Sequence, residues 1–163
     1  MLPATTENLD ETVRACRRMA TKAALKSAFA GALPIPLVDV AIDLKILARL
    51  LSEVNERFGL SQGQMSHYHE ELRLGLFDLI KRTGAKFAGR YITLAVLMPV
   101  LRRMGLRVTA RQTAKYVPVI GTGLTMAVSF SAMKFVANLH IRECAEIVRQ
   151  AHARGVGSIR EES

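Results

Sequence analysis

Few residues in this chain of 163 have the types and spacing that chemistry requires. The densest group is His67, His69, Glu70 and Glu71, whose side chains are of the kinds that bind metals. On a helix His67 shares a face with Glu70 or Glu71 but not with His69, because residues on one face are three or four positions apart. The sequence offers no second group of ligands to complete a site. We therefore expect solvated surface residues and no metal here.

A second set of such residues lies in the last quarter of the chain. His140 and Cys144 are four residues apart, and His152 lies two turns further on. Zinc takes four protein ligands, or three and a water, and the sequence shows no fourth ligand. We interpret these residues as structural. Because no Ser-His-Asp or Cys-His arrangement is supported by the local sequence, we expect neither enzymatic activity nor a cofactor.

Asp39 and Asp43 form a pair of carboxylates at i, i+4, a spacing that suits acid–base chemistry or cation binding. Asp39 falls near the first turn of a predicted helix, where the helix dipole stabilises an acid. Asp43 lies nearer the apolar side, where pairing with a basic residue of another helix is expected. We interpret both as structural. The chain also lacks a Gly-x-x-x-x-Gly-Lys-Ser/Thr loop, so nucleotide binding of that kind is not expected.

The charge distribution is more informative than any of these groups. The chain has 23 Lys and Arg against 14 Asp and Glu, a net charge of +9. No acidic residue occurs between Asp78 and Glu143, and a second acid-free stretch separates Glu11 from Asp39. A surface of one sign attracts polyanions, and the abundant kinds are anionic lipid and nucleic acid.

Apolar residues recur every three or four positions, and no useful length of chain alternates with period two. This pattern predicts an all-α fold, a single domain over residues 1–163 built as a bundle of five to six helices. A long apolar helix is expected after the proline turn at 33–36, ending at the cap residue Gly59. Its apolar positions are Leu37, Val40, Leu44, Leu47, Leu51, Val54 and Phe58. A shorter helix is expected from Met65 to Thr83, with Leu72, Leu76 or Leu79, and Ile80 facing inward.

Two stripes of Lys and Arg are predicted to bind an anionic partner. A basic amphipathic helix is expected over residues 9–30, opened by a capping box of Asn8 and Glu11, with Val13, Cys16, Ala20, Ala23 and Ala24 on its apolar side. Cations recur every four residues along it, and again before the last helix. The predicted anion-binding residues are Arg14, Arg18, Lys22, Lys26, Arg103, Arg107, Arg111 and Lys115.

Two uncharged segments lie close to these stripes, at 91–101 and 117–133. The first is too short to span a bilayer, which needs about 20 residues. The second opens a helix that continues to about residue 153, and for 117–139 we favour a buried core helix or re-entrant hairpin over a membrane span. The remaining residues, 155–163, are expected to form a frayed tail. The residues predicted to contact a membrane or partner are Leu97, Met98, Val119, Ile120, Leu124, Met126 and Phe130.

Two proline-opened apolar helices form a recognisable layout. The first follows Ala-Leu-Pro-Ile-Pro-Leu-Val-Asp at 32–39 and ends in Phe58-Gly59, and the second follows Val-Pro-Val-Ile-Gly-Thr-Gly at 117–123. Over residues 20 to 140, and especially across 32–140, the chain resembles the helical domain of unknown function found beside Era-type P-loop GTPases and in YcjF-like membrane proteins of bacteria. It is similar, more distantly, to the EcsC family. The resemblance implies an all-helical unit, association with membranes and a GTPase partner.

These observations lead us to expect a non-enzymatic helical protein that docks on anionic membrane, peripheral or integral at the cytoplasmic side of the inner membrane. A separate GTPase and a second copy of the chain are further candidate partners. A pore-forming or membrane-disrupting effector is one alternative. Nucleic-acid binding is another, less favoured because the cations are not interleaved with aromatic residues that stack on bases. The N-terminus lacks the pattern of a cleaved signal peptide, and two cysteines without a spacing motif suit a reducing cytoplasm.

Overall fold

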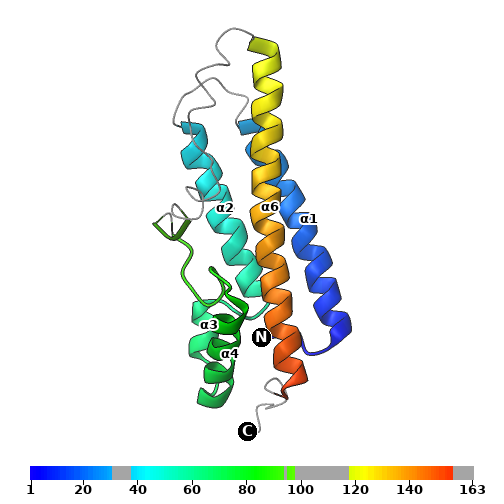
Figure 1. The fold of residues 1–163 in the computed structure, drawn as a ribbon, viewed down its shortest axis with the longest axis vertical. Helices are drawn as coiled ribbons and strands as arrows, with labels where there is room; N and C mark the ends of the chain where they lie inside the picture. Colours follow the sequence, from blue (N-terminus) through cyan, green and yellow to red (C-terminus); the bar gives the residue numbers. More distant parts are fainter. Residues whose placement is uncertain (31–37, 94, 98–117, 156–163) are drawn as a thin grey trace.

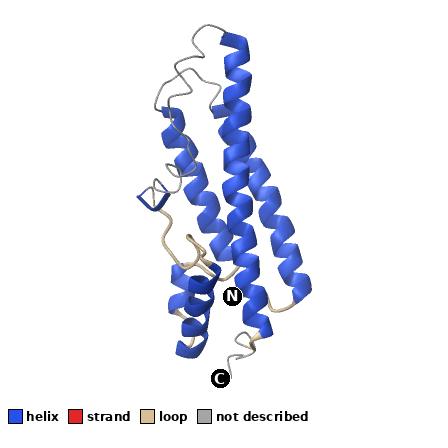
Figure 2. Ribbon diagram, viewed as in Figure 1, coloured by secondary structure: helices blue, strands red, loops and turns tan. Residues whose placement is uncertain are grey.

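The computed structural model describes residues 1–30, 38–93, 95–97 and 118–155 (Figures 1 and 2). The helices defined over these residues are α1 (Thr6–Ala30), α2 (Val38–Arg57), α3 (Gln62–Ser66), α4 (Glu70–Thr83) and α6 (Pro118–Ala153). No strand occurs in the described part of the chain, so the predicted all-α class and helical bundle are confirmed.

Three long helices stand side by side along the long axis of the molecule (Figure 1). Helix α6 packs against both α1 and α2 and runs antiparallel to α1. Helices α3 and α4 are short and lie at one end of the bundle, where α4 packs against the last turns of α6. The core therefore runs between the three long helices and continues under α4.

Helix α1 starts three residues before the predicted position. Thr5 caps it, because its Oγ1 accepts a hydrogen bond from Asn8 N at 3.1 Å and its carbonyl accepts one from Leu9 N at 3.0 Å. The predicted capping box of Asn8 and Glu11 is therefore wrong. The apolar side of the helix is as predicted, since Cys16, Ala20 and Ala24 are fully buried and Val13 and Ala23 pack against the core.

Helix α2 buries its predicted apolar positions from Leu44 to Phe58, while Leu37 lies outside the described residues. Gly59 ends the helix with φ +70°, and Gly59 N and Leu60 N donate to the carbonyls of Glu56 and Asn55. A Cβ on Gly59 would lie 2.7 Å from the backbone of the first two residues. Glycine is thus required both by the turn and by the N-terminal segment that crosses it.

The single helix predicted from Met65 to Thr83 is wrong, because the structure has two helices there. A capping box of Ser61 and Gln64 starts α3, which ends at His67. Extended backbone at His69 then begins α4, whose first turn carries two glutamates favoured by the helix dipole. The positions predicted to face inward are confirmed, since Leu76 and Leu79 are buried and Leu72 and Ile80 pack against the core.

Helix α6 is the longest element, with 36 residues. Apolar side chains that recur every three or four residues along it are buried, namely Met133, Ala137, Ile141, Cys144, Val148 and Ala151, and Phe130 packs partly against the core. None of the described helices contains an apolar stretch long enough to cross a membrane, and this holds for the described part of the segment considered as a span, 117–139. Leu97, predicted to contact a membrane or partner, is 1% exposed and belongs to the core.

Candidate anion-binding groove

A shallow hollow lies between α1 and α6, and four of its six lining residues are basic. Its volume is about 470 Å³, and we call it the α1–α6 groove. It forms because the two helices are antiparallel, which places the turn from Arg17 to Thr21 opposite the turns from Lys134 to Arg142. The groove is lined by Arg17, Arg18, Thr21, Lys134, Asn138 and Arg142.

Lys134 is the most constrained cation of the groove. Its ammonium group donates a hydrogen bond to Thr21 Oγ1, and the Thr21 hydroxyl in turn donates to the carbonyl of Arg17 at 3.0 Å. The same ammonium lies 5.9 Å from the ring centroid of Phe130, within the range of a cation–π contact. Two hydrogen-bond donors of this fixed ammonium remain for a ligand.

The four cations of the groove have no acidic partner among the described residues. Some cations elsewhere in the described chain do have such partners, as in the pairs of Arg57 with Glu53 at 3.3 Å and Arg82 with Asp78 at 2.7 Å, whereas the exposed cations of α1 have none. In addition, Oδ1 of Asn138 is buried without a hydrogen-bond partner. Because like charges gathered without counter-charges repel one another, the groove favours occupation by an anion.

One of the predicted anion-binding residues of α1 lines the groove, and the other lining residues were not among those predicted. Arg14, Arg18, Lys22 and Lys26 are all exposed on α1, and the structure places Arg18 in the groove. The residues missed are Arg17, Thr21, Lys134, Asn138 and Arg142. The spacing of four along α1 excluded Arg17, and nothing in the sequence reveals which residues of α6 face it. The second predicted stripe, Arg103, Arg107, Arg111 and Lys115, lies outside the described residues.

Of the described residues predicted to contact a membrane or partner, Phe130 lies next to the groove. Phe130 lies half-buried beneath Lys134, whereas the side chains of Met98, Val119, Ile120, Leu124 and Met126 lie outside the described part of the structure. Three other apolar side chains on α1 and α6 are exposed instead: Leu25 by 46%, Phe135 by 59% and Leu139 by 44%. Phe135 and Leu139 follow directly on Lys134 and Asn138 and are one helical turn apart.

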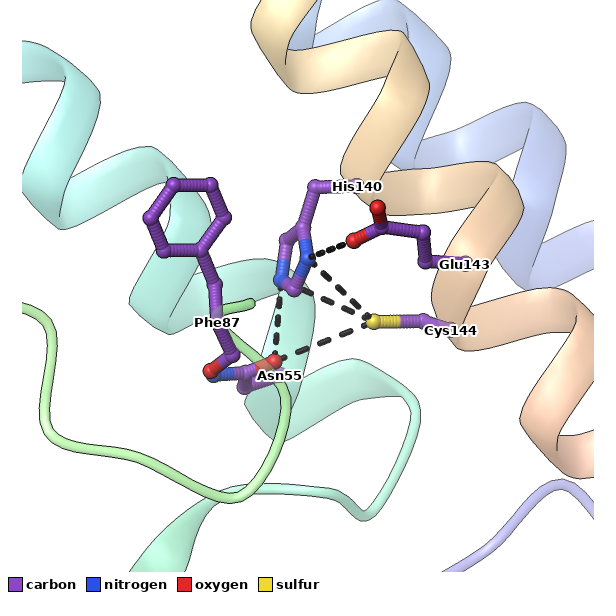
Figure 3. Close-up of polar contacts among 5 residues, drawn as sticks. All are labelled: Asn55, Phe87, His140, Glu143 and Cys144. Carbon is purple, nitrogen blue, oxygen red and sulfur yellow. Dashed lines mark hydrogen bonds and ion pairs between the residues drawn. The ribbon is translucent and has the colours of Figure 1, made fainter. Parts of the chain in front are cut away.

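A second polar group lies in the core on another side of α6 (Figure 3). Nδ2 of Asn55 donates to the carbonyl of Phe87 at 2.9 Å, which turns Oδ1 toward His140. His140 Nε2 lies 2.9 Å from that oxygen and must carry the proton that bridges them. Cys144 Sγ lies 3.6 Å from the same nitrogen, and the Phe87 ring meets the imidazole edge-on at 5.6 Å between centroids. We call Asn55, Phe87, His140, Glu143 and Cys144 the buried polar cluster.

The chemistry of this cluster is that of a packed core. Asn55 and His140 are 1% and 0% exposed. Burial raises the pKa of the Cys144 thiol well above its usual range, and burial likewise raises the pKa of Cys16 to about 11. Reactive cysteines have the opposite shift, because the thiolate is the nucleophile. The structure therefore brings His140 and Cys144 into contact inside the core, and their structural role stays a prediction.

The other candidates from the sequence are not brought together. His67, His69, Glu70 and Glu71 are all exposed. No group of three metal-binding side chains forms within the described residues. His152 contacts the Pro3 carbonyl through Nε2 at 2.8 Å and lies apart from Cys144. The side chains of Asp39 and Asp43 fall outside the described residues.

No known protein family, curated protein or solved structure matches this chain. The resemblance to the GTPase-associated helical domain and to YcjF-like proteins gains no support from these comparisons and stays a prediction. The assignment of function consequently depends on the groove and on the surface around it.

Proposed function

We propose that this protein is a non-enzymatic membrane-docking protein that binds anionic lipid through the α1–α6 groove and the exposed cations of α1. The observation that carries the proposal is the combination of unpaired charge and exposed apolar side chains on the same two helices. An accessory role toward a separate GTPase is a further part of the proposal, and it depends on the sequence resemblance alone.

The charges supply the first contribution to binding. Each Lys or Arg held close to an anionic bilayer contributes about 1 kcal/mol. Arg17, Arg18, Lys134 and Arg142 gather in one hollow, and within the described chain no acidic side chain neutralises them. These contacts alone would give only millimolar affinity, so stable attachment also needs the insertion of apolar side chains.

The exposed apolar side chains favour lipid over nucleic acid. Leu25, Phe135 and Leu139 lie on the helices that form the groove, and such side chains insert at the boundary between headgroups and acyl chains. Nucleic-acid binding would instead favour aromatic residues spaced among the cations for stacking. On the described parts of α1 and α6, Phe135 is the only exposed aromatic residue.

The test is sedimentation of the full chain with vesicles of neutral lipid and with vesicles that also contain anionic lipid. We expect binding to anionic vesicles that weakens as salt is raised. The variant R17Q/R142Q should bind about 30-fold more weakly, since two contacts of about 1 kcal/mol each are lost. The matched control R57Q/R149Q removes two cations that already have acidic partners, and should bind like the wild type.

Four outcomes would count against the proposal. Equal binding to neutral and anionic vesicles would exclude an electrostatic dock, and equal losses in both double variants would mean that net charge alone matters. Submicromolar binding to duplex DNA or RNA, together with weak vesicle binding, would assign the groove to nucleic acid. Leakage of dye from the vesicles would instead support a membrane-disrupting effector.

A further inference from the structure

The positive charge of the α1–α6 groove is more concentrated than docking on a membrane requires. General attraction to a bilayer needs only cations spread over a surface, because many lipid headgroups share the contact. Here four cations converge on one hollow of about 470 Å³. A site of this kind responds to the charge on a single headgroup as well as to the average charge of the surface.

The polar side chains of the groove are arranged as donors to such a headgroup. The Thr21 hydroxyl fixes the Lys134 ammonium, so that less side-chain entropy is lost when an anion binds. Asn138 lies between Lys134 and Arg142 on α6, and its Oδ1 has no partner. That oxygen is an acceptor, so the Nδ2–H₂ group of the same amide is the part that can donate to a phosphate. Arginine adds paired N–H groups that match phosphate oxygens.

From these contacts we infer that the groove is a binding site for a phosphate monoester displayed as a lipid headgroup. A phosphate monoester carries about −1.5 to −2 charges and three acceptor oxygens at neutral pH. A phosphodiester lipid carries one charge per phosphate and offers fewer free oxygens. A serine headgroup divides its negative charge between a phosphodiester and a separate carboxylate. A lipid with a terminal monoester thus places the most charge within reach of Arg17, Lys134 and Arg142 at once.

This inference rests on the proposed function, and the experiment separates the two. Vesicles containing phosphatidic acid, phosphatidylglycerol or phosphatidylserine are prepared at equal total surface charge, and binding of the full chain is measured by sedimentation. We expect at least tenfold tighter binding to phosphatidic acid. Equal affinity for the three anionic lipids would overturn the inference and leave the proposed function intact, whereas equal affinity for neutral vesicles would overturn both.

Two variants that keep the net charge test the groove itself. T21V removes the acceptor that holds Lys134, and N138L removes the amide, so each should lower the preference for phosphatidic acid about threefold or more without changing binding to phosphatidylglycerol. The control T83V removes a threonine hydroxyl that likewise donates to a carbonyl of its own helix, Leu79 at 2.7 Å, but lies on α4. Circular dichroism confirms that each variant is folded. An unchanged preference in both T21V and N138L would overturn the inference.

A last experiment distinguishes a phosphate monoester on a lipid from a soluble phosphate monoester. Glycerol 3-phosphate is titrated into the protein without vesicles, and also against protein bound to phosphatidic acid. We expect weak binding alone and competition only at millimolar concentration, because the membrane adds the apolar contacts of Leu25, Phe135 and Leu139. Micromolar binding of glycerol 3-phosphate with no gain from the bilayer would overturn the lipid assignment.

Discussion

The polar residues on two sides of α6 differ in how their hydrogen-bonding groups are used. On the core side, His140 and Cys144 lie among partners, and both polar atoms of the Asn55 amide are hydrogen-bonded. On the groove side, Asn138 Oδ1 is buried without a partner, and Arg142 has no acidic partner among the described residues. Polar groups that satisfy one another stabilise a fold, whereas polar groups left without partners are the ones available to a ligand.

The largest expected effect comes from breaking the buried polar cluster. The substitution N55A removes the closest partner of two buried groups, at about 1–3 kcal/mol for each group. The Phe87 carbonyl keeps only the longer hydrogen bond from Arg90 N at 3.4 Å, and His140 Nε2–H keeps only Cys144 Sγ at 3.6 Å. We expect the free energy of unfolding in urea to fall by about 2–4 kcal/mol. The counterpart N138A removes an unpaired amide and should change stability by less than about 0.5 kcal/mol. Similar losses in the two variants would remove the distinction between the two sides of α6.

A buried thiol of the core, that of Cys16 on α1, leads us to expect a loss of stability at alkaline pH. Burial raises the pKa of Cys16 to about 11 in the folded protein, while the unfolded thiol titrates near pH 9. The unfolded state therefore loses its proton first, and the free energy of unfolding decreases as the pH rises from 9 to 11, by about 2–3 kcal/mol from this residue. The variant C16A should show a shallower decrease in urea unfolding over the same range. A decrease of equal slope in C16A would assign the effect to other groups.

The sequence was enough to predict the elements whose signal is local. Leu44, Leu51 and Ile141 are buried because apolar residues at spacings of three and four mark one face of a helix. The glycine cap of α2 follows from a similarly short pattern. The break between α3 and α4 was missed, because the apolar spacing runs on through His67 and His69 while the local capping groups end one helix and begin another.

The groove could be predicted only in part, because it is made by residues far apart in the chain. Arg17 and Arg142 face one hollow only once α1 and α6 are known to pack antiparallel. The pairing of His140 with Asn55 could not be predicted for the same reason, since Asn55 comes from α2 and its local sequence does not show which residue of α6 it meets. Periodicity identifies the buried side of each helix, but it does not say which helices meet or at which register.

A prediction of intermediate size concerns the apolar side chains beside the groove. The variant F135S/L139S should bind anionic vesicles about 30-fold more weakly, because insertion of each exposed side chain contributes on the order of 1 kcal/mol. Stability should be almost unchanged, since both side chains are already exposed. The matched control L74S/F77S removes an exposed pair on α4 and should bind like the wild type. A loss confined to the control would place the membrane-facing surface on α4.

The smallest expected effect is at the end of the bundle where charges are paired. Asp78 accepts hydrogen bonds from Arg82 at 2.7 Å and from Arg154 at 3.2 Å, so it joins α4 to the end of α6. The hydrogen bond from Arg82, above all, holds the pKa of Asp78 below its usual range. The stabilisation is therefore present above pH 4 and is lost as the pH falls through the lowered pKa.

The variant D78N tests this pair of contacts. It should unfold at a slightly lower temperature than the wild type at pH 7, and the difference should disappear as the pH falls through the lowered pKa of Asp78, where that carboxyl is itself protonated. Exposed ion pairs are weak and screened by salt, so the difference at pH 7 should also shrink in high salt. Vesicle binding should not weaken, because the two arginines released by the substitution lie away from the groove. Weaker binding in D78N would show that the paired end of the bundle, and not only the unpaired groove, contacts lipid.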